Sequence, residues 1–294
     1  MTPAQDQLTP AFEAQRPRLV RLAYATTGSL AEAEDCVQEA WLRLRRAGER
    51  TEIRDPGAWL TTTVSRIALD ALTSARARRE RYVGQWLPEP LVEDLDAHDP
   101  AEVVATDESV SMALLLVLER LTPAERTSFL LHDVFGLSFE EVAEVVGRTP
   151  ASARQLASRA RRHVQEGRPR FPPTQAEQRR LVEAFVAACQ RGDLAGLVAI
   201  LDPEVVFRGD GGGKVAALPH PEYGADNVAR RMLGFLTLPH LGMRFAEVSG
   251  APGIVMRDPW GVLTVISFTV DAGLIVAIDA VRNPDKLTGV RGPE

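Results

Sequence analysis

Lysine is almost absent from this sequence, because Lys214 and Lys286 are the only two among 34 basic residues. Positive charge is therefore carried by arginine, whose planar fork matches phosphates and guanine better than an ammonium does. Cysteine is scarce too: Cys36 and Cys189 lack the spacing of metal ligands, so two reduced core thiols are expected rather than a disulfide or a redox switch.

Long apolar runs are missing as well. No stretch reaches the roughly 18–20 apolar residues that a membrane span needs. The first residues also lack the basic and apolar stretches of a secretory signal. These absences predict a cytoplasmic protein with no membrane partner.

The net charge of −6 argues against a nucleic-acid partner, but the charges are segregated along the chain. Residues 89–108 contain eight acidic side chains and no lysine or arginine. Basic residues flank this segment: Arg76, Arg78, Arg79 and Arg81 before it, and Arg148, Arg154, Arg159, Arg161, Arg162, Arg168 and Arg170 after it. Because binding follows the local field and not the sum, both basic segments are candidate nucleic-acid contacts.

The length of 294 residues suggests two or three domains. Capping boxes at Ser29–Glu32, Thr122–Glu125 and Ser138–Glu141 predict helices over the first half of the chain. Later, alternating segments at 241–248, 253–257, 262–270 and 274–281 predict strands, after helices near 176–190, 193–201 and 226–236. The predicted division is two all-α domains at 1–85 and 109–168, linkers at 86–108 and 169–175, and an α+β domain at 176–294.

The sharpest motif is a helix-turn-helix over residues 138–165. Ala143 is small where the helices cross, Gly147 lies in the turn, and Leu156 locks the second helix to the first. The outward face of the second helix consists of Ser152, Arg154, Gln155, Ser158, Arg159 and Arg162. Arginine can pair with guanine and glutamine with adenine, while other arginines hold phosphates. A plain helical hairpin with a solvated face is the alternative, but arginines without compensating acids favour DNA binding.

Both helical segments resemble regions two and four of extracytoplasmic-function (ECF) sigma factors. The matching stretches are AEDCVQEAWLRL, PGAWLTTTVSRIALDAL with RRERYVG, LTPAERTSFLLHDVFGLSFEEVAEVVGRT, and ARQLASRARRHV. This resemblance implies a chain that binds the clamp helices and flap of RNA polymerase core and directs the enzyme to promoter DNA. Asp35, Gln38 and Leu42, which share one helical face, would contact the clamp helices.

The same resemblance assigns promoter contacts. Arg66 and Asp70, with Arg76 and Arg79 near the end of their helix, would bind the −10 element, and the region-four helix would contact the −35 element. Ile67 stands where such helices usually have Asn, which affects the details of −10 binding. The acidic linker would thread the positively lined nucleic-acid path of the polymerase, although a solvated spacer would have the same composition.

Three further motifs resemble those of ECF group 41, the SigJ-like factors: YVGQWLPEPL at 82–91, DGGGK at 210–214 and NPDKL at 283–287. Gln85 replaces the usual Pro of the first motif. The resemblance implies a cone-shaped, nuclear-transport-factor-like fold (SnoaL-like) for the third domain, which would modulate activity by contacting the sigma core. The predicted contact residues are Trp86, Leu87, Pro88, Glu89 and Pro90, with Asp210, Gly211, Gly212, Gly213 and Lys214, and with Asn283, Pro284, Asp285, Lys286 and Leu287.

DGGGK is not a phosphate-binding P-loop, because Arg208 stands at the first Gly position and Val215 at the Ser/Thr position. A simple hairpin turn explains its glycines nearly as well as a contact surface does. His220 and His240 both lie next to Pro and have no sequence-adjacent partner for acid–base work, so no catalysis, cofactor or metal is predicted.

Two other functions stay open from the sequence. One is a one-component helix-turn-helix regulator that senses a ligand, since an apolar molecule would suit the aromatic and aliphatic lining of the cone. The other is a SnoaL-like enzyme with a helical extension. A repressor needs neither the Asp35/Gln38/Leu42 face nor the arginine cluster at 76–81, and the presence of both favours the sigma factor.

Overall fold

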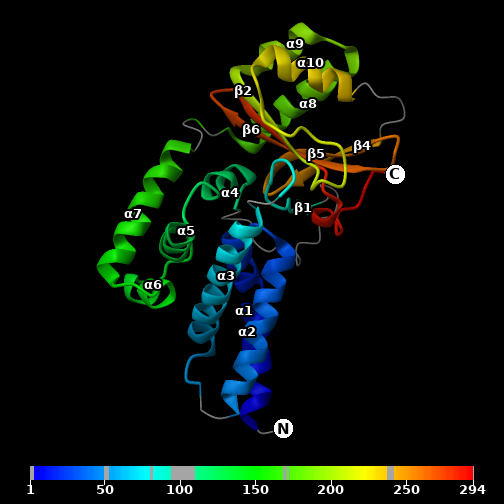
Figure 1. The fold of residues 1–294 in the computed structure, drawn as a ribbon. Helices are drawn as coiled ribbons and strands as arrows, with labels where there is room; N and C mark the ends of the chain where they lie inside the picture. The colour runs from blue at the N-terminus through cyan, green and yellow to red at the C-terminus, as the bar shows by residue number, and fades with distance from the viewer. Residues whose placement is uncertain are drawn as a thin grey trace. The chain divides into compact units, whose positions relative to one another are not determined.

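A computed structural model describes residues 3–49, 53–79, 82–93, 110–167, 171, 173–236 and 242–293, without side chains for 3–7 and 76–79. The chain forms two compact units. The helical unit contains Met1–Glu80 and Val117–Gly167, and the sheet unit contains Arg81–Leu116 and Arg168–Glu294. Figure 1 shows the elements of each unit.

The helical unit begins with three helices, α1 (Pro3–Thr27), α2 (Leu30–Gly48) and α3 (Pro56–Arg79). Gly28 takes a positive φ of 76° between α1 and α2, and the Ser29 side chain accepts from the Glu32 N–H, which is one of the two bonds of the predicted capping box. α2 buries Ala33, Cys36, Val37, Ala40 and Leu44, which lie at helical spacing on one stripe. That stripe packs against α1 and α3, and leaves the opposite face of α2 to solvent.

The second part of the helical unit holds the end of α4 (Met112–Leu118), then α5 (Pro123–Phe129), the π-helix η1 (Leu130–Val134), α6 (Phe139–Val146) and α7 (Pro150–Gly167). The capping boxes at Thr122/Glu125 and Ser138/Glu141 are both formed. Gly147 ends α6 in the left-handed conformation, with φ at 63°. Buried Ala143 on α6 and Ala153, Ala157 and Ala160 on α7 let the two helices approach closely.

The sheet unit contains three helices, α8 (Gln175–Arg191), α9 (Leu194–Ile200) and α10 (Ala225–Leu236), and the short η2 (Pro284–Lys286). Its strands are β1 (Val92–Glu93), β2 (Leu201–Asp210), β3 (Glu222–Tyr223), β4 (Gly242–Val248), β5 (Ala251–Arg257), β6 (Leu263–Asp271) and β7 (Leu274–Val281). The sheet order is β1-β4-β5-β6-β7-β2-β3, and β2 runs parallel to β7 while the other pairs are antiparallel. Figure 1 shows α8, α9 and α10 on one side of this sheet.

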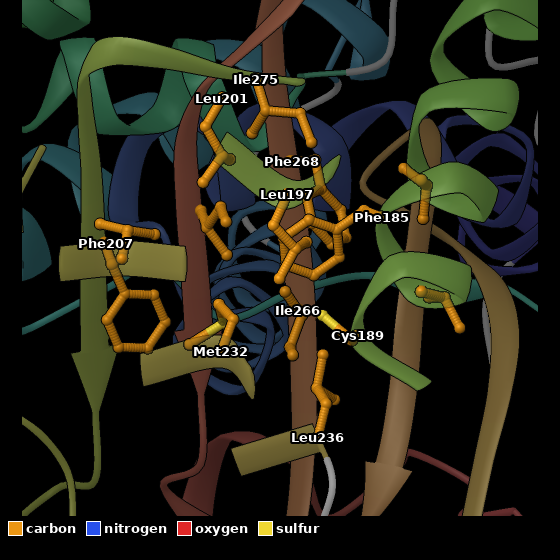
Figure 2. Packing of buried hydrophobic residues seen from close by; sticks show 14 of the residues in the cluster. Phe185, Cys189, Leu197, Leu201, Phe207, Met232, Leu236, Ile266, Phe268 and Ile275 are labelled. Carbon is orange, nitrogen blue, oxygen red and sulfur yellow. The ribbon is translucent and has the colours of Figure 1, made fainter. Parts of the chain in front are cut away.

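Each face of the sheet has its own apolar cluster, because side chains alternate along a strand. On the helix-covered face, Phe185 and Phe268 meet edge to face with centroids 5.2 Å apart, among Leu197, Met232 and Ile266 (Figure 2). On the second face the buried residues are Leu87, Ala246, Val248, Val255, Val265, Val281 and Leu287. The segment before β1 therefore contributes Leu87 to the covering of the second face.

The predicted α+β fold and its last four strands are confirmed. The sequence missed β1, which lies inside the predicted linker 86–108 and pairs Val92 with Val248. Val92 also packs against the apolar cluster of the second face, which explains why this edge strand forms. The remaining linker residues 94–108 lie outside the described residues.

Candidate nucleic-acid and polymerase interfaces

The outward face of α7 is exposed as the sequence predicts. Arg154, Gln155, Ser158, Arg159 and Arg162 are exposed, and Ser152 is half-buried. Ala153, Leu156 and Ala157 lie on the inward side, fully or half-buried. This face can offer guanidinium and amide donors to the edges of bases and to phosphates.

Arg161 belongs to the same basic segment but has a different role. Its guanidinium forms an ion pair with Asp133 of η1, with a distance of 2.6 Å from Nη2 to Oδ1. The pair ties α7 to η1, which precedes the helix-turn-helix. Arg161 therefore has a structural role, unlike the arginines on the outward face of α7.

The residues predicted to contact the polymerase lie on one exposed face of α2. Asp35, Gln38 and Leu42 are all exposed, and Leu42 shows 38% of its surface to solvent. They lie opposite the buried stripe that contains Cys36 and Leu44. An exposed leucine between polar side chains suits a protein partner better than DNA.

The predicted −10 residues differ in how they are placed. Arg66 on α3 forms an ion pair with Glu144 of α6, at 2.8 Å, and also donates to the Glu144 carbonyl. Asp70 is exposed. Arg76 and Arg79 lie on α3, but their side chains are outside the described residues. One candidate DNA-binding cation is thus bonded to the helix-turn-helix itself.

Two more arginines join the two parts of the helical unit. Arg126 of α5 is 1% exposed and donates from Nε and Nη2 to the Ala25 carbonyl, at 3.1 and 2.9 Å, while its Nη1 contacts Glu119. Arg18 of α1 donates to Thr61 at 3.3 Å and to the Phe135 carbonyl at 3.2 Å. Neither residue was among the predicted contacts. We name the Arg126–Ala25 bonds the Arg126 contact.

In the sheet unit, the three motifs meet at the buried carboxylate of Asp210. It accepts from the Tyr82 hydroxyl at 2.6 Å, the Leu87 N–H at 2.9 Å and the Lys286 ammonium at 2.7 Å. Lys286 also donates to the Leu87 carbonyl, and its Nζ lies 4.1 Å from the centroid of the Trp86 ring. The Asn283 amide donates to the Tyr82 hydroxyl at 2.8 Å. We name these residues, Tyr82, Trp86, Leu87, Asp210, Asn283 and Lys286, the Asp210 network.

Other predicted members of these motifs have smaller parts. Gly212 has a φ of 64° and donates its N–H to Asp210, and a Cβ there would meet the Asn283 side chain at 2.4 Å. Lys214 pairs with Asp285 at 2.6 Å on the surface. Pro88 and Pro90 are buried and Glu89 is half-buried. A glycine at position 212 is therefore required by the close approach of Asn283.

Tyr82 was missed as a contact residue, although it opens the motif YVGQWLPEPL. Burial, with the hydrogen bond to Asp210 as a second cause, raises the pKa of its hydroxyl well above the usual range. The hydroxyl is therefore a constant donor to Asp210. An aromatic residue with a polar tip beside a proline-containing motif was the available signal.

Buried carboxylates elsewhere in the sheet unit have structural partners. Asp258 accepts from Arg282 at 2.7 Å and from the N–H groups of Trp260 and Val262. Asp279 forms a bidentate pair with Arg208. Within the described ranges, no group of three or more His, Cys, Asp or Glu side chains could hold a metal ion, and no helix is long and apolar enough to cross a membrane.

Comparison with known proteins decides between the functions that the sequence left open. Residues 11–78 match the model of sigma-70 region 2, and residues 111–164 match that of sigma-70, region 4. The chain is 44% identical over 295 residues to the ECF RNA polymerase sigma factor SigJ of Mycobacterium tuberculosis, covering 95% of this chain and 92% of that protein. This chain belongs to the ECF RNA polymerase sigma factors.

Other relatives of the sigma factor agree. It is 36% identical to the probable ECF RNA polymerase sigma factor SigI of Mycobacterium tuberculosis, over 97% of both chains. The crystal structure of the extracytoplasmic function sigma factor SigJ from Mycobacterium tuberculosis has a TM-score of 0.77 at 39% identity, covering 96% of this chain and 98% of that chain. The predicted family and fold class are confirmed. The sigma factor therefore acts with RNA polymerase core at promoter DNA in transcription initiation.

Proposed function

We propose that the sigma factor divides its contacts among three surfaces. Asp35, Gln38 and Leu42 contact the clamp helices of the polymerase. Arg66 and Asp70, with Arg76 and Arg79, bind the −10 element. The exposed face of α7 binds the −35 element through Ser152, Arg154, Gln155, Ser158, Arg159 and Arg162, and this face is the observation that carries the proposal.

Transcription in vitro with purified polymerase core tests these roles. Leu42→Ala and Gln38→Ala are expected to weaken core binding while leaving the −35 base preference of the assembled enzyme unchanged. Replacing a phosphate-binding arginine of α7 is expected to weaken binding to all promoter sequences equally. Replacing a base-contacting arginine is expected to cost about 1–3 kcal/mol of binding free energy and to relax the base preference at a single position. No transcript from promoters selected genome-wide would overturn the proposal.

The helical unit represents a closed form of the sigma factor. Arg18, Arg66 and Arg126 connect α1 and α3 to α5, η1 and α6. Two promoter elements named −35 and −10 lie about 25 base pairs apart, which is about 85 Å of B-form DNA at about 3.4 Å per base pair. Regions in direct contact cannot occupy both elements, so these arginine contacts have to open on the promoter.

The C-terminal domain modulates activity through the chain that connects regions 2 and 4. The Asp210 network supports this proposal, because it holds Tyr82, Trp86 and Leu87, which follow region 2 directly. Removing the domain at Phe171 would also deprive these residues of their partners. Full-length Tyr82→Phe and Lys286→Met variants are therefore the sharper comparison, and promoter output equal to that of the unaltered chain in both would contradict this role.

Neither an enzyme nor a free-standing regulator fits as well. We assign no catalysis to the C-terminal domain, since Asp258 and Asp279 are occupied by arginines and His220 is exposed. An apolar ligand in the cone would have to displace side chains such as Phe185 and Phe268, so ligand sensing is the weaker proposal. Because RNA polymerase and its promoters are in the cytoplasm, we place the sigma factor there.

A further inference from the structure

Arg154 differs from other arginines on the outward face of α7 in lying over an aromatic ring from another helix. Its Cζ is 5.0 Å from the centroid of the Phe139 ring. Phe139 is the first residue of α6, and it is half-buried. A guanidinium at this distance from a ring centroid is attracted by the ring quadrupole.

The Phe139 ring is itself held in place. The His132 ring stacks on it, with centroids 3.8 Å apart and planes 27° apart. His132 lies in the π-helix η1, and its Nδ1 donates to the Leu137 carbonyl at 2.8 Å. The capping box of Ser138 and Glu141 fixes the backbone on either side of Phe139. A π-helical turn within a helix is often associated with a functional site.

The resulting stack has a consequence for base recognition. A free arginine side chain loses most of its rotamer freedom when it binds a base in a bidentate manner. A ring that already limits the guanidinium reduces that loss, and it favours the base that the held orientation matches.

We propose that Phe139, backed by His132, is a positioning residue that holds Arg154 for contact with one base pair of the −35 element. This inference rests on the proposed role of α7, and it adds a residue of α6 and one of η1 to the determinants of promoter specificity. Arg159, on the same face of α7, is the matched comparison.

The test measures binding of the full-length sigma factor, assembled with polymerase core, to promoter fragments carrying every single substitution in the −35 element. Arg154→Ala is expected to abolish discrimination at one base pair, and Arg159→Ala to leave discrimination at that base pair unchanged. Phe139→Leu is expected to reduce discrimination about fivefold at that base pair alone, in line with an exposed cation–π contact of about 1 kcal/mol. Phe139→Tyr, which keeps the aromatic ring, is expected to preserve this discrimination.

The outcomes separate the two proposals. If Arg154→Ala leaves the base profile unchanged, the assignment of Arg154 to the −35 element fails, and the positioning role fails with it. If Arg154→Ala alters the profile but Phe139→Leu does not, or weakens all positions equally, only the positioning role is overturned. His132→Leu tests the stack with Phe139 intact and decides the matter should Phe139→Leu unfold. In the double variant, Phe139→Leu should add nothing to the loss caused by Arg154→Ala.

Discussion

The helical unit and the sheet unit each contain a cation that joins segments far apart in the sequence, Arg126 and Lys286, and the two cations are satisfied differently. Arg126 in the helical unit donates chiefly to a neutral backbone carbonyl, that of Ala25, with Glu119 at its other edge. Lys286 in the sheet unit pairs with Asp210, which is 0% exposed. Separating Arg126 from Ala25 leaves behind no buried charge, because the guanidinium can return to water. Separating Lys286 from Asp210 leaves a buried carboxylate, which is far more costly.

The difference indicates which of the two contacts can open reversibly. The Arg126 contact joins regions 2 and 4, and the proposed promoter contacts require these regions to separate. The Asp210 network holds the C-terminal domain on the connecting chain, and its charges compensate each other only while it is intact. We therefore expect the first contact to open during initiation and the second to persist.

The largest expected effect comes from Asp210→Ala. It removes the buried acceptor of the Tyr82 hydroxyl, the Leu87 N–H and the Lys286 ammonium, so the sheet unit should lose about 3–5 kcal/mol of unfolding free energy. Urea unfolding followed by tryptophan fluorescence measures it. Lys214→Ala, which breaks an exposed pair with Asp285, is the control and should cost under about 1 kcal/mol. Equal losses in both would contradict the comparison.

Arg126→Met should have the next largest effect, weakening the contact between regions 2 and 4 by about 1–3 kcal/mol. Spectroscopic labels on cysteines introduced at the exposed positions 34 and 165 should then report a population with a longer separation. The buried native thiols Cys36 and Cys189 will not compete, since burial raises the pKa of Cys36 to about 11 and that of Cys189 to about 12. Arg120→Met, at an exposed neighbouring site, should leave the distance unchanged.

Tyr82→Phe should destabilise the sheet unit by about 1 kcal/mol, because only the hydroxyl bonds to Asp210 and Asn283 are lost. The folded state raises the pKa of this hydroxyl. Its stabilising contribution is therefore complete below the unfolded pKa of about 10 and declines as the pH rises above it. The difference between the Tyr82→Phe variant and the unaltered chain should shrink above that pH, and a constant difference would argue against the hydroxyl as its source.

The smallest effect is expected for Glu144→Gln. In its pair with Arg66, the Arg66 side chain is 47% exposed and the Glu144 side chain 63% exposed. The helical unit should therefore lose under about 1 kcal/mol of unfolding free energy, and high salt should reduce this loss further. Because the variant removes the negative charge that pairs with Arg66 and keeps only the bond to the Glu144 carbonyl, promoter complexes should form faster at low salt. A slower rate would show that the pair does not restrain region 2.

The sequence predicted the parts whose signals are local. Ser138 and Glu141 mark the start of α6, and Gly147 marks its end. The exposed arginines of α7 follow from the helical spacing of their positions. The Arg126 contact could not be found in this way, because its acceptor is a backbone carbonyl that any residue at position 25 would supply. Nor could β1, since two residues of strand have no periodicity, and Val92 is ordered by apolar partners far away in the chain.

The anchoring of β1 has a consequence for the reach of the chain. Val92 pairs with β4, and Leu116 packs on the same face of the sheet, so the connecting chain is attached to one domain at both of its ends. Residues 81–116 could extend over about 120 Å at about 3.4 Å per residue if they were free. Because Val92 and Leu116 are both attached to the C-terminal domain, the chain between them adds only the distance between these two residues to the separation of regions 2 and 4. The length of connector available to span a promoter is therefore set by how much of it the C-terminal domain holds.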